Sequence, residues 1–529
     1  MRRRILQVLI ILLVSMFLRI YPTIISNLPF STDSWPLIRN AEKLIKSSPT
    51  PLSSELFDGY NNYWPLSQVF GSIISIILGV TPANALRIYI PLTAAFSPLI
   101  LYILLRRVTK SGLIGFLAGV LFASGGPHAT FTAGVTKETF ANLLFFQSIY
   151  IFSALGSGLM EIITFSIVMV ALTMSHHMAY LVGIVILSNI FIAQVFLPRI
   201  CSDSLNKRLG MLLAAALIGL IYYLVYALPG LKVTLSFSDW LSAFSFQVLA
   251  FLAMFYVIAR PKPRKLPRSW IAMVLAMMVA LFINQVTPIL PASPHLTPIA
   301  LFYAYLLIVM GLFAVIGVYS VKERRLDEKI YPVLLWLSST LGLEGYAIFG
   351  VNPSLSLTLA YRIPNFIIPA LSTLTTIGIL RLSSVGKTQK ILALLGFTLL
   401  AVALASESYS ATILQENYLG YQWLYLPDEY RAAIWINHHH HDQPVYGDLK
   451  IKYLLEEYMG LRVDSGGGYS FLAGERKPGS EAILVTYKTM EKNGYVLGPY
   501  GAELPANWSK NLYRINKVFS TLNSSIFQL

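Results

Sequence analysis

Charged residues are scarce in this chain. They make up 12% of its 529 residues, whereas 55% are hydrophobic. A soluble globule needs more polar side chains than this to cover its surface, and several apolar runs approach the length of a bilayer span. The composition therefore excludes a soluble enzyme or binding module and predicts an integral membrane protein.

Acids are the rarer of the two charges, 25 against 40 lysines and arginines, so the formal net charge is +15. In a soluble chain this excess would suggest a nucleic-acid partner. Here the basic residues lie in short clusters between apolar segments, as the positive-inside rule predicts for cytoplasmic loops. The charge therefore indicates topology, and no nucleic-acid partner is expected.

Cysteine is almost absent as well. Cys201 is the only one, so no internal disulfide can form. It lies in a loop expected on the reducing, cytoplasmic side, and we expect no role for it. A cleavage site made of small residues is also lacking before Asp33, so residues 5–27 are interpreted as an uncleaved first helix and not as a signal peptide.

Apolar segments long enough to span a membrane are, by contrast, abundant, and we count about thirteen. Basic clusters follow every second segment, which places these clusters and the N-terminus in the cytoplasm. The thirteen segments cover residues 5–27, 85–105, 112–127, 140–156, 159–175, 178–198, 209–228, 241–259, 269–290, 298–320, 330–347, 363–380 and 390–406.

One further apolar stretch, residues 64–80, is only about seventeen residues long. If it crossed the membrane, every later basic loop would be exported. A re-entrant or interfacial helix keeps the charge pattern intact. We therefore interpret residues 28–84 as one long external loop whose helices lie on the membrane.

The composition changes near residue 407, beyond which charged residues and turn signals become frequent and no further span follows. Helices are predicted near 428–437 and 449–459, and strands at 444–447 and 482–487. Thirteen crossings place this tail outside the cell.

The predicted fold is therefore an all-α polytopic membrane domain over residues 1–406, with about thirteen transmembrane helices, followed by a small external α/β domain over residues 407–529. The expected location is the cell membrane, with many passes, a cytoplasmic N-terminus and an extracellular C-terminal domain.

Asp33 is the residue at which we expect chemistry. It follows the first span, and a carboxylate at the mouth of a membrane domain is costly to desolvate, so such residues tend to line a cavity or a reaction centre. The alternative is a helix N-cap, because Ser34-Trp35-Pro36 looks like a helix start with proline in the first turn. Both roles can coexist.

Other polar side chains gather on the inferred outer face from loops that are distant in sequence. Lys137 and Glu138 lie between the third and fourth spans, His176 and His177 between the fifth and sixth, and Arg362 before the twelfth. A carboxylate can act as a general base or bind a metal, whereas arginine and histidine can neutralise a phosphate. Their shared depth predicts one site.

Each of these residues has a simpler alternative. Lys137 and Glu138 could be solvated beside a helix start. Adjacent residues on a helix face different directions, so at most one of His176 and His177 is expected in the site, against an anchoring role at the interface. Arg362 breaks the positive-inside pattern because it lies on the predicted outer side. It is expected either to bind a phosphate anion or to form a structural ion pair.

Two further polar features are expected to be structural. Glu344, near the outer end of the eleventh span, could face the same cavity, but an interhelical hydrogen bond is favoured. The run from His438 to Asp442 follows a helix and lacks the spacing of a zinc site, so no metal is expected there.

In these respects the chain resembles the GT-C class of membrane glycosyltransferases, which includes protein mannosyltransferases, aminoarabinose transferases and the catalytic subunits of oligosaccharyltransferases. The resemblance covers the whole chain, from the acid in the first external loop to the external C-terminal domain. The segments that carry it are Ser31-Thr32-Asp33-Ser34-Trp35, Tyr60-Asn61-Asn62-Tyr63-Trp64-Pro65-Leu66, Ala133-Gly134-Val135-Thr136-Lys137-Glu138, Ala433-Ile434-Trp435-Ile436 and Val445-Tyr446-Gly447-Asp448.

The resemblance implies a chemistry. Members with a single acid in the first loop use it as the general base on an acceptor hydroxyl, with a polyprenyl-phosphate sugar as donor and no metal cofactor. Asp33 would then be the base, and Arg362, helped by His176, His177 or Lys137, would hold the donor phosphate. The Trp-Trp-Asp-Tyr-Gly sequence that marks sequon recognition in oligosaccharyltransferases is absent from the tail.

The leading hypothesis is a transferase that moves a sugar from a dolichyl- or polyprenyl-phosphate carrier to a lipid-linked glycan on the external face, in an archaeal-type glycosylation pathway. Within the enzyme class, the alternative is an oligosaccharyltransferase that delivers glycan to protein, with a divalent metal held by Asp33 and Glu138. From another class, a transporter or lipid flippase would place its charged residues near the bilayer midplane.

Overall fold

The structure is a computed structural model in which the chain forms two compact units. It describes residues 2–47, 57, 59–154, 158–197, 205–230, 236–259, 268–287, 298–323, 327–350, 352–384, 386–414, 418–440, 442–475, 482–497 and 501–529. Unit 1 comprises Met1–Leu18, Thr93–Phe131 and Ala141–Ser408, and unit 2 comprises Arg19–Leu92, Thr132–Phe140 and Tyr409–Leu529. Cys201 and His441 lie outside the described residues.

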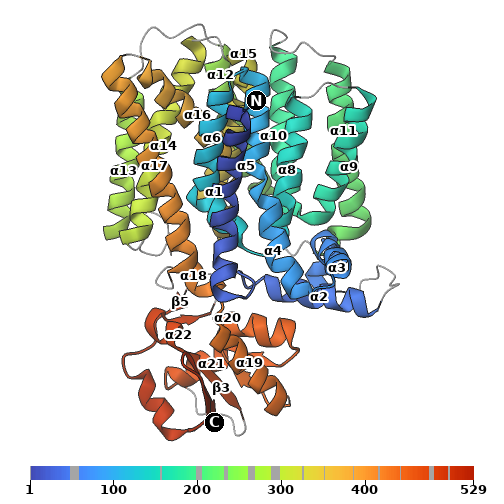
Figure 1. The fold of residues 1–529 in the computed structure, drawn as a ribbon, viewed down its shortest axis with the longest axis vertical. Coiled ribbons are helices and arrows are strands. Elements are labelled where there is room, and N and C mark those ends of the chain that lie inside the picture. The colour runs from blue at the N-terminus through green and yellow to red at the C-terminus, as the bar shows by residue number, and fades with distance from the viewer. Residues whose placement is uncertain are drawn as a thin grey trace. The chain divides into compact units, whose positions relative to one another are not determined.

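Helices form at all thirteen of the predicted spans (Figure 1). They are α1 (Arg2–Ser26), α4 (Pro82–Ala95) with α5 (Ser97–Thr109), α6 (Gly112–Ser124), α8 (Lys137–Ala154), α9 (Leu159–Ser175), α10 (His177–Phe196), α11 (Leu205–Tyr222) with the turns η3 (Tyr223–Ala227) and η4 (Leu228–Gly230), α12 (Phe237–Ala259), α13 (Arg268–Val286), α14 (Pro298–Glu323), α15 (Asp327–Phe349), α16 (Pro353–Ser383) and α17 (Lys387–Ile413).

Within the described residues, nine helical stretches are long and apolar enough to cross a membrane, and a tenth if a bent pair is counted as one span. The bent pair is α6 and α7 (Gly126–Ala133), whose axes differ by 58°. Pro127 explains the break, because it lacks the amide proton of a helix interior and its ring clashes with the preceding turn. The chain is a multi-pass membrane protein.

Close helix packing builds the core of unit 1. Trp336 on α15 packs edge-on against Phe145 and donates its indole N–H to the carbonyl of Phe366 on α16 at 2.8 Å. On α14 and α16, Gly317 and Gly378 face each other's backbones so closely that a Cβ on either would lie 2.0 Å from a carbonyl oxygen. Small residues of this kind let membrane helices approach.

The first long loop belongs to unit 2 and carries three short helices. They are α2 (Ser34–Lys46), the 3-10 turn η1 (Gly59–Tyr63) and α3 (Leu66–Leu78). Helix α2 is amphipathic and buries Trp35, Leu37 and Ile38. Helix α3 has 13 residues, so it is about 20 Å long, shorter than the roughly 30 Å hydrocarbon core of a bilayer. The stretch that we interpreted as non-spanning is therefore too short to cross.

The C-terminal part of unit 2 is a small α/β fold around a mixed five-stranded sheet of order β2-β1-β3-β7-β6. β1 (Val445–Tyr446) pairs in parallel with β2 (Val463–Asp464) and with β3 (Ile483–Tyr487). β7 (Ser524–Gln528) runs antiparallel to β3 and to β6 (Asn516–Ser520). All five residues of β3 are buried, which makes it the core strand of the sheet.

The same part of unit 2 also contains short helices and a second, two-stranded sheet. The helices are α18 (Tyr418–Trp423), α19 (Pro427–His439), α20 (Leu449–Lys452), the π-helical segment η5 (Tyr453–Tyr458), α21 (Ser465–Leu472), α22 (Lys488–Asn493) and the 3-10 helix η6 (Trp508–Arg514). The strands of the second sheet are β4 (Tyr495–Val496) and β5 (Gly501–Ala502). Both predicted tail helices and both predicted strands are present. The predicted boundary between residues 406 and 407 stays a prediction.

Candidate functional site

Asp33 lies in a tight turn directly before α2. The turn is centred on Ser31, a buried non-glycine residue with φ +103°. The Ser31 Oγ accepts a hydrogen bond from the Asp33 amide at 3.2 Å, and the Ser31 carbonyl accepts one from the Ser34 hydroxyl at 2.6 Å. The turn is therefore stabilised by its own serine side chains.

The Asp33 carboxylate does not cap α2, although Asp33 occupies the N-cap position. Its backbone is helical, with φ −64° and ψ −13°, and its side chain makes no capping hydrogen bond. The amides of Ser34 and Trp35 instead donate to the carbonyls of Ser31 and Thr32, at 3.3 and 3.4 Å. Asp33 itself is exposed. The capping role that we kept as an alternative is thus not the role seen.

Three segments of unit 2, which come from two loops, meet near this turn. The Val135 amide donates to the Phe30 carbonyl at 2.8 Å, which joins the stretch before α8 to the Asp33 turn. The Lys137 ammonium donates to Asn61 Oδ1 at 2.9 Å and lies 3.6 Å from the centre of the Tyr60 ring, a close cation–π contact. These three segments, from two loops that we predict to be external, therefore converge in space.

Glu138 lies in the first turn of α8 and is almost fully buried, with 2% of its surface exposed. The Thr136 hydroxyl caps this helix by accepting from the Thr139 amide at 3.0 Å. A carboxylate in the first turn is also favoured by the helix dipole. Glu138 is thus not the solvated residue of the simpler alternative.

An aromatic cluster anchors α2 on the C-terminal part of unit 2. The Trp35 ring packs against Tyr425, Tyr430 and Tyr458, with centroid distances of 5.2, 5.7 and 5.3 Å. Arg39 extends the contact by donating to the carbonyl of Glu457 at 3.2 Å. The helix that begins beside Asp33 is therefore fixed to residues that follow it by about 400 positions.

His176 and His177 belong to unit 1. His176 is buried and has an extended backbone, and its Nδ1 accepts from the Ala179 amide at 3.3 Å, so it is the N-cap of α10. The two rings lie 4.9 Å apart. Our argument that adjacent histidines face different directions assumed that both are helical, whereas His176 precedes the helix. That at most one of them enters the site stays a prediction.

Arg362 is half-buried on α16, also in unit 1. Its Nε donates to the Tyr361 hydroxyl at 3.2 Å, and its guanidinium carbon lies 5.8 Å from the centre of the Phe131 ring. Aromatic rings of this kind orient a guanidinium. The role of Arg362 in binding a phosphate stays a prediction.

Arg19 is a functional candidate that the sequence reasoning missed. It is fully buried on α1, within unit 2, and donates from Nε to the Thr132 hydroxyl at 2.8 Å. Thr132 begins the stretch that leads to Val135 and Lys137. The sequence did contain a signal, which is the charge of Arg19 within an apolar span. Burying an arginine there costs free energy, so its presence indicates a specific interaction partner.

Metal ligands do not cluster in the part of the chain that the structure describes: no group of three or more His, Cys, Asp or Glu side chains could hold an ion. In the histidine run of the tail, His439 Nδ1 bonds to the Trp435 carbonyl at 2.9 Å and His440 Nδ1 to Gln443 at 2.7 Å. These histidines bond locally. Glu344 Oε2, expected in an interhelical hydrogen bond, is buried and has no partner among the described residues.

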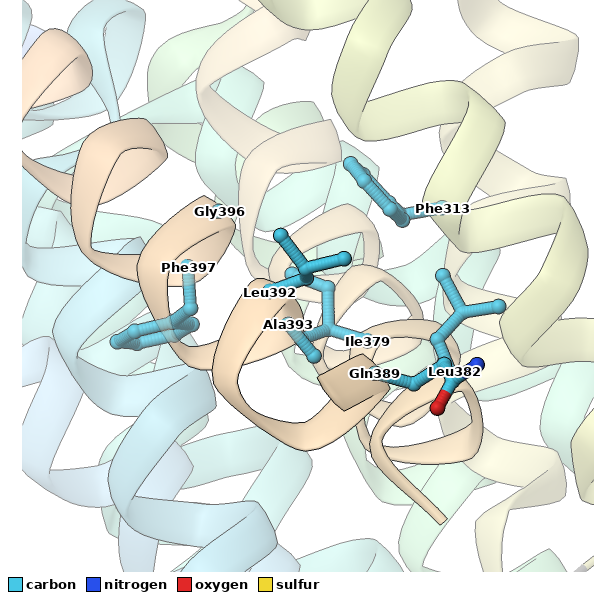
Figure 2. Close-up of a pocket in the computed structure, with 8 residues that line it drawn as sticks. All are labelled: Phe313, Ile379, Leu382, Gln389, Leu392, Ala393, Gly396 and Phe397. Carbon is cyan, nitrogen blue, oxygen red and sulfur yellow. The ribbon is translucent and has the colours of Figure 1, made fainter. Parts of the chain in front are cut away.

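An apolar pocket of about 240 Å³ opens between α14, α16 and α17 of unit 1 (Figure 2). Its walls are hydrocarbon apart from Gln389, and it contains no titratable side chain. Its α16 residue Ile379 lies seventeen positions beyond Arg362, roughly 25 Å along a helix. The pocket therefore lies away from Arg362.

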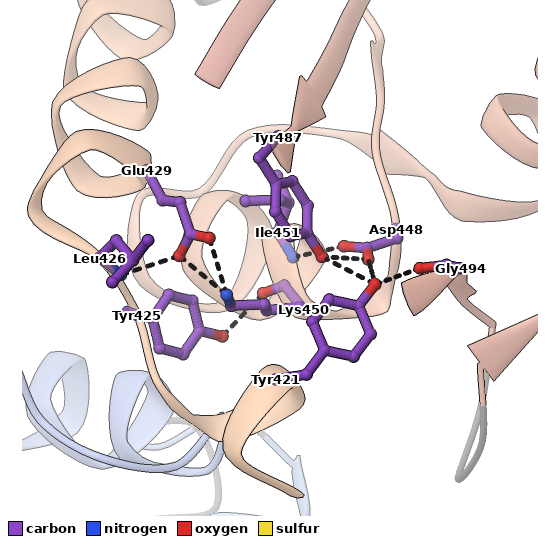
Figure 3. Close-up of polar contacts among 9 residues, drawn as sticks. All are labelled: Tyr421, Tyr425, Leu426, Glu429, Asp448, Lys450, Ile451, Tyr487 and Gly494. Carbon is purple, nitrogen blue, oxygen red and sulfur yellow. Dashed lines mark hydrogen bonds and ion pairs between the residues drawn. The ribbon is translucent and has the colours of Figure 1, made fainter. Parts of the chain in front are cut away.

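A second buried polar cluster stabilises the C-terminal part of unit 2 (Figure 3). Lys450 and Glu429 form an ion pair at 2.8 Å with both side chains 1% exposed. Asp448 accepts hydrogen bonds from the Tyr487 hydroxyl and, at 3.0 Å, from the Ile451 amide. Burial raises the pKa of Asp448, while these donors act in the opposite direction. With every partner supplied from within, this cluster is structural.

No protein-family model matches the chain, and no curated protein matches it in sequence. Its fold is similar to that of the oligosaccharyltransferase of Archaeoglobus fulgidus, with a TM-score of 0.58 and 15% identity over 92% of this chain and 70% of that one. The same enzyme in complex with zinc and sulfate gives a TM-score of 0.58, 15% identity and coverage of 92% and 68%.

A second structure, ArnT from Cupriavidus metallidurans, aligns over 99% of this chain and 96% of that one at 12% identity and a TM-score of 0.40. The likeness to the archaeal oligosaccharyltransferase supports the fold predicted from the sequence, a polytopic helical membrane domain with a small α/β part at the C-terminus.

Proposed function

We propose that this protein is a membrane glycosyltransferase that moves a sugar from a polyprenyl-phosphate carrier to a lipid-linked glycan on the external face. The observation that supports it best is the meeting of three segments from two loops near the Asp33 turn, with the carboxylate left out of helix capping. A carboxylate that its own helix does not use is available for an external proton.

Asp33 would act as the general base. The acceptor hydroxyl attacks the anomeric carbon of the donor, its proton passes to the Asp33 carboxylate, and the bond between the anomeric carbon and the phosphate oxygen breaks. The phosphate oxygen keeps the electron pair of that bond, and the phosphate remains attached to the lipid carrier as the leaving group. Negative charge therefore develops on the phosphate in the transition state, and cations stabilise it.

Arg362, with His176, His177 and Lys137, would hold that phosphate. Arg362 donates to Tyr361 and Lys137 donates to Asn61. A guanidinium and an ammonium are both positively charged and carry only donors, which suits them to phosphate oxygens. Arg362 is the principal candidate because arginine binds phosphate with two parallel hydrogen bonds.

The test is turnover of purified protein with a polyprenyl-phosphate sugar and a lipid-linked acceptor. Asp33→Asn should abolish product formation, because the amide is nearly isosteric but cannot accept the proton. Asp442→Asn is the matched control, since it removes an exposed acid from the same unit. Undiminished turnover in Asp33→Asn would refute the assignment.

Transfer of glycan to protein is a second candidate, favoured by the fold of the archaeal oligosaccharyltransferase, which has been crystallised with a tethered acceptor peptide. In this case Asp33 and Glu138 would hold a divalent cation, because magnesium is commonly bound by one or two carboxylates together with substrate phosphate. The assay is glycosylation of a peptide that contains an Asn-X-Thr triplet, with and without a divalent cation. Product that needs both the peptide and the cation would favour this candidate.

A further inference from the structure

Ser31 has an unusual backbone for its residue type. Residues with a side chain rarely adopt positive φ, and Ser31 does so at +103° while fully buried. Such a conformation persists only where the surroundings impose it, and it concentrates at functional sites. The contacts that hold Ser31 in this conformation are therefore of interest.

Two anchors fix the turn from opposite ends. The Ser31 amide donates to the Trp423 carbonyl at 3.0 Å, and the preceding carbonyl, that of Phe30, accepts from Val135 at 2.8 Å. The rings of Phe30 and Trp423 also pack edge to face at 5.6 Å. The chain is thus held at Ser31 by the C-terminal segment on one side and by the loop before α8 on the other.

The consequence falls on Asp33. Because the Ser31 Oγ accepts from the Asp33 amide, the backbone of Asp33 is drawn into a helical conformation. An N-cap side chain reaches the amides of the first turn from an extended backbone. The turn at Ser31 therefore keeps the carboxylate away from those amides, whose first two donate to carbonyls of the turn.

We propose that Ser31 is a positioning residue: its hydroxyl and its anchor on Trp423 hold the Asp33 carboxylate free of the helix end and available to the acceptor. The proposal rests on the proposed function, in which Asp33 is the base. In this proposal the C-terminal part of unit 2 also helps to position the base, through the bond from the Ser31 amide to the Trp423 carbonyl. The aromatic cluster around Trp35 fixes the other side of Asp33 to the same segment.

The experiment compares three substitutions at Ser31 in the full-length protein. Ser31→Ala removes only the hydroxyl. Ser31→Gly adopts positive φ without strain but also lacks the acceptor. Ser31→Asn tolerates positive φ, and its side-chain oxygen can accept from the amide two residues on, as the serine does. Ser111→Ala is the matched control, because it removes a similar hydroxyl–amide bond, 3.3 Å from Ile114, at the start of α6 in unit 1.

Turnover should separate these variants. We expect kcat to fall roughly ten- to a hundredfold in Ser31→Ala and Ser31→Gly with little change in KM, because a misplaced base affects the transition state and not substrate binding. Ser31→Asn should restore most of kcat, and Ser111→Ala should equal the wild type. A purely structural role would lower thermal stability in step with activity, and Ser31→Asn would then bring no recovery.

Two outcomes would overturn the inference. One is wild-type kcat in Ser31→Ala while Asp33→Asn is inactive, which refutes the positioning role and leaves the base in place. The other is a loss of kcat that Ser31→Asn does not restore, which excludes the hydrogen bond as the device. If Asp33→Asn itself keeps full activity, the proposed function fails, and this result is distinct from both.

Discussion

Single side chains connect the loops of unit 2, and Lys137 does so most clearly. Its ammonium contacts the Tyr60 ring and Asn61, which lies 76 positions earlier in the chain. Sequence reasoning identified both segments but could not predict that they touch, because neither pattern has a periodicity that relates the two. Arg19 was missed because its long apolar run was interpreted only as a span.

Substitution of Lys137 tests whether this contact joins the loops. Lys137→Met keeps the length and apolar stem but loses the charge, so the cation–π contact and the bond to Asn61 both disappear. We expect the free energy of unfolding to fall by about 1–2 kcal/mol and turnover to decrease. Lys137→Arg should retain most of both. Lys110→Met removes an exposed lysine before α6 and should change neither.

Asp448 gives a prediction for pH. Burial raises the pKa of this carboxyl in the folded protein above its unfolded value of about 4. The folded state therefore binds the proton more tightly, so the stability contributed by protonation is present below about pH 4 and is lost as the pH rises through the folded pKa. The melting temperature of the wild type should fall relative to that of Asp448→Asn, which cannot ionise, as the pH rises from 4 to 7. A wild type that gains stability relative to the variant with rising pH would contradict this account.

At the scale of elements, apolar periodicity predicted every span-length helix as well as β1, β3, α19 and the helix that begins at α20. It failed where polar residues dominate: β6 is mostly exposed, so the β6–β7 hairpin over residues 516–528 carried little apolar signal. The segment 112–127 was predicted as one span, but its helix ends at Ser124, because Gly125, Gly126 and Pro127 break it.

The packing of α14 against α16 depends on two glycines. Gly317→Ala would place a Cβ 2.0 Å from the Leu374 carbonyl, and backbone cannot yield without separating the helices. We expect a fall in melting temperature that corresponds to about 1–3 kcal/mol. Gly311→Ala, on the same helix, is the control, because a Cβ there meets nothing within 4 Å and alanine favours helix. Equal stability of the two variants would refute the close approach.

For the whole molecule, the charge pattern predicts sidedness. With Cys201 replaced by serine, a cysteine at the exposed position Tyr513 should react with a membrane-impermeant maleimide in intact cells. A cysteine at Lys387, exposed at the start of α17, should react only after the membrane is opened. The reverse pattern would place the Asp33 loop in the cytoplasm and remove the external site.

The proposed site also has a whole-molecule requirement that sequence reasoning stated only as a shared depth. Asp33 and Lys137 belong to unit 2, whereas Arg362, His176 and His177 belong to unit 1. Sequence gave the chemical types of these groups, because charges in external loops are few. Whether these groups act together is a long-range property that no local pattern encodes.

The most direct test is therefore an experimental structure of the full-length protein with polyprenyl phosphate bound. We predict phosphate oxygens within about 4 Å of the Arg362 guanidinium, the distance of an ion pair, and the Asp33 carboxylate facing the same cavity within the reach of one sugar ring. A phosphate bound away from Arg362, or an Asp33 carboxylate separated from it by more than one sugar, would contradict the proposed mechanism.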